Sequence, residues 1–261
     1  MPLTVADLMA NPQASEKAER GRATRTLKAL RESYSITKAI GSRSSKRLWP
    51  LHGWLKIELE KLLTDPRWKI TAKISEKTKE IKVEGRYYGK KVDVGIDFEG
   101  ETIGVVSIKY IMSSYGKNAI NYFEQQLGET ANLRKQNIVY GNIFIVTNPI
   151  PVLESGGVFK NWETLREQGL RRYVHLRSDS EPHAPDELAV IVTQINHSVK
   201  PKPGEEYQLG AVTRLVDLQT HWQAVTGSPA DSGTRKSLEQ LTINSFINGL
   251  VPRLCTRAIT P

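Results

Sequence analysis

The order of patterned segments between residues 68 and 146 constrains the fold of this chain most. Residues 68–74, 80–88, 91–98 and 102–110 alternate apolar with polar side chains, and charged or glycine-containing turns separate them. We expect four strands in an antiparallel meander. Residues 118–134 have helical periodicity, whereas the apolar run 140–146 (YGNIFIV) is typical of a buried strand. A strand, a helix and a strand in this order predict a crossover in a mixed sheet.

Helical patterns precede this region, and weaker patterns follow it. The periodicity predicts helices at 16–40 and 51–63, with a loop at 41–47 between them. Beyond residue 150, the patterns predict helices at 162–168, 215–225 and 237–250, a strand at 188–195, and loops at 198–206 and 226–236. No internal repeat or sharp boundary interrupts the chain. We therefore expect one α/β domain over residues 1–261, with a central mixed β-sheet flanked by helices.

Positive charge is concentrated near the N-terminus. The whole chain has a net charge of +9, and residues 17–47 contain ten basic against two acidic residues, a net of +8. A basic amphipathic helix of this kind is able to lie along a phosphate backbone, which makes a nucleic acid a reasonable partner. The alternative is a solvated helix face, and such patches also bind membranes and acidic proteins.

Cysteine content and hydropathy bear on the cellular location. The single cysteine, Cys255, cannot form an internal disulfide or a thiolate zinc site alone, which fits a reducing environment. No apolar run approaches the roughly 18 residues of a membrane span, and the N-terminus lacks the apolar segment of a signal peptide. We expect an intracellular protein that is not bound to a membrane.

The chemistry-bearing side chains lie in residues 91–110 (KVDVGIDFEGETIGVVSIKY). On strands, side chains two positions apart share a face, so Ser107 and Lys109 point the same way. Across the FEGE turn, Asp93 on the neighbouring strand adds a carboxylate. This combination suits Mg²⁺-dependent phosphodiester cleavage, in which Asp93 and the Ile108 carbonyl hold the cation and the lysine orients water.

These residues resemble the PD-(D/E)xK nucleases and, within them, the type II restriction endonucleases. Val92-Asp93 stands where the family has Pro-Asp, and Ser107-Ile108-Lys109 stands where it has Glu-x-Lys, 14 residues after Asp93. Residues 113–134 (SSYGKNAINYFEQQLGETANLR) are similar to the helix that follows the catalytic lysine in several restriction enzymes. The resemblance covers about residues 80–150. It implies a restriction-endonuclease-like core that cleaves double-stranded DNA at a specific site with Mg²⁺.

The chain departs from the family pattern at Ser107, which replaces the middle acid. Some relatives in the family carry serine there and supply the carboxylate from the following helix, where Glu124 is the first candidate and Glu129 the second. An early helix often supplies a further acid in such enzymes, and Glu58, beside Glu60, occupies that place here. The resemblance thus implies the catalytic set Asp93, Ser107, Lys109, Glu124 and Glu58, with the metal on Asp93, Ile108 and Glu124.

The same resemblance implies binding partners and a separate function for each part of the chain. Residues 1–66 form the basic helical part, residues 67–150 the catalytic core, and residues 151–261 the part for DNA recognition and dimerisation. A homodimer is expected because cutting both strands symmetrically needs two active sites. The expected place is a prokaryotic cytoplasm, with nucleoid DNA as substrate. The expected DNA contacts are Arg22, Arg25, Lys28, Arg43, Lys46, Arg47, Lys117, Asn118, Arg171 and Arg172, with Arg177, Lys200 and Lys202 as further candidates for base contacts.

Several alternatives stay open. Asp97 is a candidate ligand with Asp93 in support, and Ser107 is also compatible with an ordinary strand position. The chain lacks nucleophile-elbow, zinc-hydrolase and phosphate-loop motifs, so acyl transfer, a histidine metal centre and a nucleotide cofactor have no support. Alternative functions are a repair or junction nuclease, and a DNA-binding protein whose nuclease core has decayed. An RNA-binding or membrane-surface module would leave the pairing of Asp93 with Lys109 unexplained.

Overall fold

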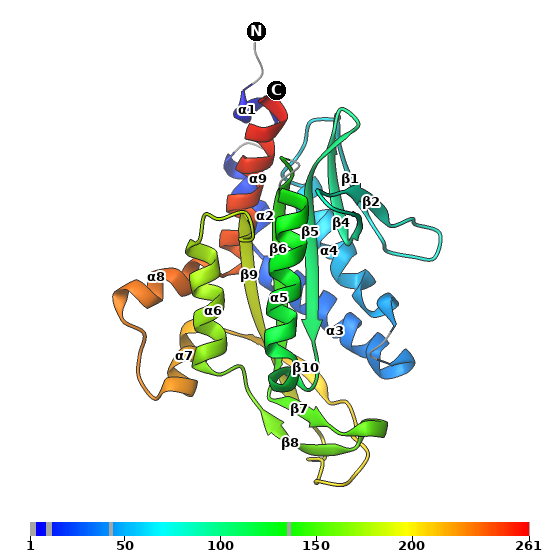
Figure 1. Cartoon of the computed structure of the whole chain (residues 1–261), viewed down its shortest axis with the longest axis vertical. Coiled ribbons are helices and arrows are strands. Elements are labelled where there is room, and N and C mark those ends of the chain that lie inside the picture. The colour runs from blue at the N-terminus through cyan, green and yellow to red at the C-terminus, as the bar shows by residue number, and fades with distance from the viewer. Residues whose placement is uncertain (1–3, 9–11, 42–43, 135–136, 261) are drawn as a thin grey trace.

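A six-stranded mixed sheet forms the centre of the molecule in the computed structural model, which describes residues 4–8, 12–41, 44–134 and 137–260 (Figure 1). In spatial order its strands are β1 (Trp68–Ala72), β4 (Val94–Phe98), β5 (Glu101–Ile111), β6 (Val139–Asn148), β9 (Glu187–Asn196) and β10 (Ala211–Val216). Strand β4 is antiparallel to both of its neighbours, β1 and β5. Strands β5, β6 and β9 are parallel, and β10 is antiparallel to β9. The expected α/β class with a mixed sheet and flanking helices is confirmed.

The crossover from β5 to β6 is made by helix α5 (Tyr115–Arg134), which covers one face of the sheet (Figure 1). A parallel neighbour requires such a connection because the chain must return to the starting end of the sheet. The predicted crossover is therefore confirmed. The pairing of β5 with β6 places Ser107 directly opposite Asn142.

Helices cover both faces of the sheet, and alternate strand residues enter two separate cores. Ile143 and Ile145 pack on one side, while Phe144 and Val146 pack on the other. The first side is covered by α1 (Val5–Leu8), α2 (Pro12–Glu19), α3 (Arg22–Ile40), α4 (Trp49–Glu60) and α9 (Ile243–Ile259). The second side is covered by α5, α6 (Glu167–Ser178), α7 (Leu218–Thr226) and α8 (Ser232–Gln240). In the part of the chain that the structure describes, none of the helices has the length and apolar character needed to cross a bilayer.

Two hairpins lie outside the main sheet: β2 (Ile81–Glu84) with β3 (Gly89–Val92), and β7 (Ile150–Leu153) with β8 (Phe159–Glu163). The expected meander of four strands is therefore wrong in one part. The segment 80–88 pairs only with β3, because the strand predicted at 91–98 breaks at Asp93 into β3 and β4. This break turns the β2–β3 hairpin away from the central sheet.

Other boundaries also differ from the sequence-based expectation. The predicted N-terminal helix divides into α2 and α3 at Gly21, which has a positive φ of 75°. The short 3₁₀ helix η1 (Ser45–Leu48) takes up part of the expected loop at 41–47, and residues 42–43 lie outside the described residues. The predicted helix at 237–250 is two helices, α8 and α9, and α8 begins inside the expected loop at 226–236.

The segment predicted as a helix at 162–168 is mostly extended. Trp162 lies on β8, where its ring packs against Phe159 and Tyr207 at centroid distances of 4.8 and 6.1 Å. This aromatic contact between distant segments outweighs the local helical spacing. The 3₁₀ turn η2 (Ser155–Gly157) links β7 to β8, and α6 begins only at Glu167.

Candidate active site

Asp93 occupies the break between β3 and β4, where its carboxylate reaches across to β5. One carboxylate oxygen, Oδ2, accepts a hydrogen bond from the backbone N–H of Ile108 at 2.7 Å. The acid is therefore fixed beside the two residues on either side of Ile108, Ser107 and Lys109. Burial raises the pKa of Asp93, while the neighbouring His52 and the hydrogen bond from Ile108 act in the opposite direction.

His52, on helix α4, is the second group that faces this carboxylate. Its Nδ1 lies 2.9 Å from the carbonyl oxygen of Lys73, and because a carbonyl only accepts, Nδ1 must carry a proton. The other ring nitrogen, Nε2, is buried, lies 3.5 Å from Asp93 Oδ1 and makes no hydrogen bond within the described residues. The imidazole thus lies beside the second carboxylate oxygen of Asp93 without a hydrogen bond to it.

A polar cleft of about 250 Å³ opens on the other side of Asp93. It lies between strand β5, helix α5 and the hairpin strand β3, with Arg47 and Leu48 from the region before α4 at one end. Its lining comprises Arg47, Leu48, Lys90, Lys91, Asp93, Ser107, Ile108, Lys109, Tyr110, Tyr122, Gln125, Gln126, Glu129, Asn142 and Phe144. The three residues that carry the sequence motif are therefore in one site, as the alternation of the strands predicts.

Lys109 stands at the exposed side of the cleft. Its Nζ lies 5.0 Å from the centroid of the Tyr122 ring, a cation–π distance that holds the ammonium over helix α5. Ser107, two residues earlier on the same face, is partly exposed. A single strand thus presents a hydroxyl and an ammonium group toward the same cleft, next to a carboxylate.

Asn142, on β6, was not among the residues predicted from the sequence. It lies opposite Ser107, it is 4% exposed, and its Oδ1 makes no hydrogen bond among the described residues. A buried amide oxygen without a partner has a free-energy cost, which a bound cation or water removes. In the sequence, the one indication of this position is that Asn142 is a polar residue within an otherwise apolar strand, YGNIFIV.

Of the two glutamates considered on helix α5, the structure places the second in the cleft. Glu129 lines it and is paired with Lys90 at 2.5 Å. Glu124 is exposed and is not part of the cleft lining. The side of α5 that faces the cleft carries Tyr122, Gln125, Gln126 and Glu129, with helical spacing, and this spacing leaves Glu124 on another side. Glu124 therefore lies outside the cleft, and of the two candidates only Glu129 is placed where it could hold a cation bound there.

Glu58 is also placed elsewhere. Its side chain is fully buried and accepts hydrogen bonds from Arg22, Arg25 and Lys61. Burial acts to raise the pKa of Glu58, but the hydrogen bonds from Arg25 and Lys61 outweigh it and the pKa is lowered. Helix α4 does reach the site, as the resemblance implies, but it does so through His52. Glu58 belongs to a structural ion cluster rather than to the cleft.

The expected DNA contacts also need correction. Arg22 is only 1% exposed, and Arg25 donates to both carboxylate oxygens of Glu58, so these two arginines join α3 to α4. Arg47 lies in the cleft and donates to the carbonyl of Tyr110 at 3.2 Å, while Arg43 lies outside the described residues. Lys28 pairs with Glu32.

The other expected DNA contacts are spread over the surface. Lys46 pairs with Glu76, and Lys117 is exposed at the start of α5. Asn118 donates to the carbonyl of Ser114. Arg171 pairs with Glu167 and lies over the Trp222 ring, and Arg172 is partly exposed. Among the further candidates, Arg177 binds the buried Glu187, whereas Lys200 and Lys202 are exposed.

The oxygen donors of the cleft fit a hard cation. Asp93, Glu129 and Asn142, whose side-chain oxygen has no partner within the described residues, line one cleft together with Ile108. No group of three histidine, cysteine, aspartate or glutamate side chains in the described ranges is placed to hold a metal. Water would therefore complete the coordination, as is usual for Mg²⁺ bound through one or two carboxylates. Asp97, the alternative ligand, accepts instead from the Thr102 hydroxyl at 2.6 Å and is not part of the cleft.

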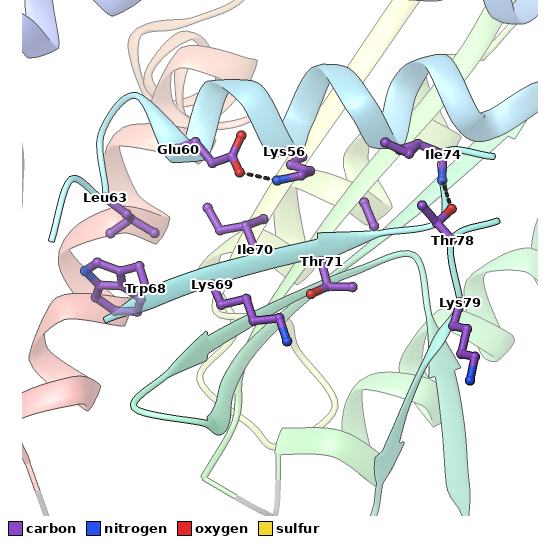
Figure 2. A pocket seen from close by; sticks show the side chains of 11 residues that line it. Lys56, Glu60, Leu63, Trp68, Lys69, Ile70, Thr71, Ile74, Thr78 and Lys79 are labelled. Carbon is purple, nitrogen blue, oxygen red and sulfur yellow. Dashed lines mark hydrogen bonds and ion pairs between the residues drawn. The ribbon is translucent and has the colours of Figure 1, made fainter. Parts of the chain in front are cut away.

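A second hollow lies between helix α4 and the edge strand β1 (Figure 2). Its volume is about 490 Å³, and Ile70, Leu63 and Trp68 form an apolar side while Lys69 and Lys79 lie at the other (Figure 2). Its one carboxylate, Glu60, pairs with Lys56 (Figure 2). This groove lacks a free acid beside a lysine, so we assign the chemistry to the cleft at Asp93.

Comparisons with known proteins neither add to nor contradict this assignment. No family model matches the chain, and no curated protein and no solved structure shows significant similarity to it.

Proposed function

We propose that this chain is a Mg²⁺-dependent nuclease that hydrolyses phosphodiester bonds in double-stranded DNA. One observation carries the proposal: the Asp93 carboxylate is hydrogen-bonded to the backbone between Ser107 and Lys109, at the mouth of a polar cleft. A carboxylate and an amine that line the same cleft can serve phosphoryl transfer. The carboxylate holds a cation, and the amine stabilises negative charge on the phosphate.

The residues of the cleft have distinct roles in this proposal. Asp93, Glu129 and Asn142 would hold the cation, which supplies a polarised phosphate and a more acidic attacking water when bound. Lys109 donates hydrogen bonds to the attacking water or to the phosphate oxygens. The hydrogen bond from Ile108 fixes the orientation of Asp93, with His52 beside its second oxygen, and Ser107 occupies the position of the missing acid without blocking the cleft.

Within this proposal we assign a restriction-endonuclease-like core and cleavage at a specific short sequence. The order β4, β5, α5, β6 supports the assignment, because it presents the acid, the lysine and the following helix in the order of the family pattern. A homodimer would place two such clefts on the two DNA strands. The proposed setting is a prokaryotic cytoplasm.

The test is cleavage of plasmid and linear DNA of known sequence in Mg²⁺ by the full chain and by Lys109→Ala. The wild type should give discrete fragments, and the variant should cut at least about 100-fold more slowly, because a donor to the developing charge is lost. Lys236→Ala, which removes an exposed lysine of helix α8 outside both the cleft and the expected DNA contacts, is the matched control and should cut normally. Cutting of branched DNA without sequence preference would instead support a junction nuclease.

A second candidate function is DNA binding by a nuclease core that has lost its activity. The observation in its favour is the pairing of Glu129 with Lys90, which leaves Asp93 as the one cleft carboxylate without a lysine partner in the described chain. This candidate predicts binding of DNA in Mg²⁺ without cleavage. Lys109→Ala would then change the affinity only slightly.

A further inference from the structure

The turn of the β2–β3 hairpin exposes two adjacent aromatic rings. Tyr87 is 72% exposed and Tyr88 is 52% exposed. All other aromatic side chains in the described ranges are buried or only partly exposed. Two neighbouring exposed rings are costly to leave in water, and they therefore indicate a surface that something covers.

The turn is fixed rather than free. The side-chain oxygen of Asn132, on helix α5, accepts from the backbone N–H groups of Tyr87 at 2.9 Å and Tyr88 at 3.4 Å. Its Nδ2 donates to the Tyr88 carbonyl at 3.0 Å, and its own carbonyl accepts from the Arg86 N–H at 2.8 Å. Gly85 is required there, because a Cβ would lie 2.1 Å from Asn132 Nδ2. The same helix that borders the cleft thus holds both rings in place.

The hairpin is also basic. It carries Lys82, Arg86, Lys90 and Lys91 against a single acid, Glu84. The Arg86 guanidinium lies 5.1 Å from the Tyr87 ring centroid, and Lys90 and Lys91 line the cleft. Lys82 pairs with Glu84 and Lys91 pairs with Glu80 in exposed ion pairs, which are weak and can exchange for phosphate, whereas Lys90 pairs with the partly buried Glu129.

Aromatic rings beside positive charge match the chemistry of a single-stranded nucleic acid. Bases stack on such rings without regard to sequence, while lysine and arginine follow the phosphates. A lipid surface would require apolar side chains around the rings, and the neighbouring residues are lysine, arginine and glycine instead. Tyr88 is five residues from Asp93 along β3, which corresponds to at most about 17 Å. At the stacked rise of about 3.4 Å per nucleotide, a base on the ring would therefore be at most about five nucleotides from a phosphate in the cleft.

We propose that Tyr87 and Tyr88 form a stacking platform for unpaired bases, so that the preferred ligand is duplex DNA with an adjoining unpaired segment. The placement of the phosphate in the cleft rests on the proposed nuclease function, whereas the stacking itself does not.

The test measures binding without cleavage, by fluorescence anisotropy in EDTA. One DNA is a labelled duplex, and the other has the same sequence with a five-nucleotide mismatched bubble. The wild type should bind the bubble more tightly. Tyr87→Leu/Tyr88→Leu should lose about tenfold or more in affinity for the bubble and less than twofold for the duplex, because stacking is lost. The matched control, Tyr87→Phe/Tyr88→Phe, retains both rings and should bind like the wild type.

A second readout reports stacking directly. With 2-aminopurine in the bubble, the wild type and the phenylalanine variant should quench its fluorescence on binding, and the leucine variant should not. The platform would be rejected if the leucine variant lost equal affinity for the bubble and the duplex. It would also be rejected if this variant lost no affinity and still quenched 2-aminopurine fluorescence. If Lys109-dependent cleavage persists in that case, the nuclease stands without the platform. Tyrosine-dependent bubble binding without any cleavage would support the platform and reject the nuclease.

Discussion

Substitution of Asn142 tests metal binding independently of the stability of the metal-free protein. The Oδ1 of Asn142 is buried, lines the cleft and makes no hydrogen bond within the described chain, so its removal breaks no contact of the fold that the structure shows. We expect Asn142→Ala to leave the melting temperature without metal unchanged or higher, and to reduce the increase that Mg²⁺ or Mn²⁺ produces. Thermal melts with and without each cation measure both effects. Asn121→Ala on the exposed side of α5 is the control. If Asn142→Ala retains the full metal-induced increase, the amide is not a ligand.

From the sequence, we could predict only those site residues that lie on segments close together in the chain. Asp93, Ser107 and Lys109 lie on neighbouring antiparallel strands, so alternation and a short turn are enough to bring them together. Asn142 reaches the cleft through parallel pairing of β5 with β6, and His52 through packing of α4 beside β1. Neither contact leaves a trace in local periodicity, because both depend on how distant segments pack.

At the scale of elements, the ion cluster around Glu58 joins helix α3 to helix α4. We expect Glu58→Gln to lower the free energy of unfolding by about 3–5 kcal/mol, because the almost fully buried Arg22 would lose its charged partner. Urea denaturation followed by circular dichroism measures the loss. Glu60→Gln, which breaks a partly exposed pair with Lys56 on the same helix, should cost less than about 1 kcal/mol.

The same variant distinguishes a structural from a catalytic role. Because Glu58 lies outside the cleft, the folded fraction of Glu58→Gln should cleave DNA at the wild-type rate per molecule. A loss of cleavage with normal stability would instead place Glu58 in the reaction and contradict the ion-cluster assignment.

Elements with strong local patterns were predicted well, and those shaped by distant contacts were not. β6 and β9 are long apolar strands whose patterns need no partner to be recognised. The extended segment at Trp162 depends on an aromatic cluster that includes Tyr207, more than 40 residues away. The break at Asp93 depends on its bond to Ile108, which competes with a continuous strand and turns the β2–β3 hairpin outward.

At the scale of the whole molecule, helix α9 joins the C-terminal part of the chain to the central sheet. Phe246 is fully buried, and a Cβ on Gly141 would lie 2.8 Å from its ring, so the helix contacts β6 directly. Leu254 packs still more closely over Gly104 of β5, where a Cβ would lie 2.2 Å from its Cδ2. The strands that carry Lys109 and Asn142 are therefore supported by residues more than 100 positions later in the chain, as expected for one folding unit.

This arrangement predicts a single cooperative unfolding transition. Phe246→Ala should cost about 3–5 kcal/mol and lower the stability of the whole chain, because the cavity lies where α9 meets the sheet. Two further variants restrict tryptophan fluorescence to one part of the chain each. Trp162→Phe/Trp222→Phe retains the tryptophans at 49, 54 and 68 in the N-terminal part. Trp49→Phe/Trp54→Phe/Trp68→Phe retains those at 162 and 222. In each protein the urea midpoint from fluorescence should equal its own midpoint from circular dichroism, with and without Phe246→Ala. A single midpoint is expected because helix α9 packs against the central sheet, so neither part of the chain can unfold without the other. Two separated midpoints would contradict this and divide the chain into independent domains.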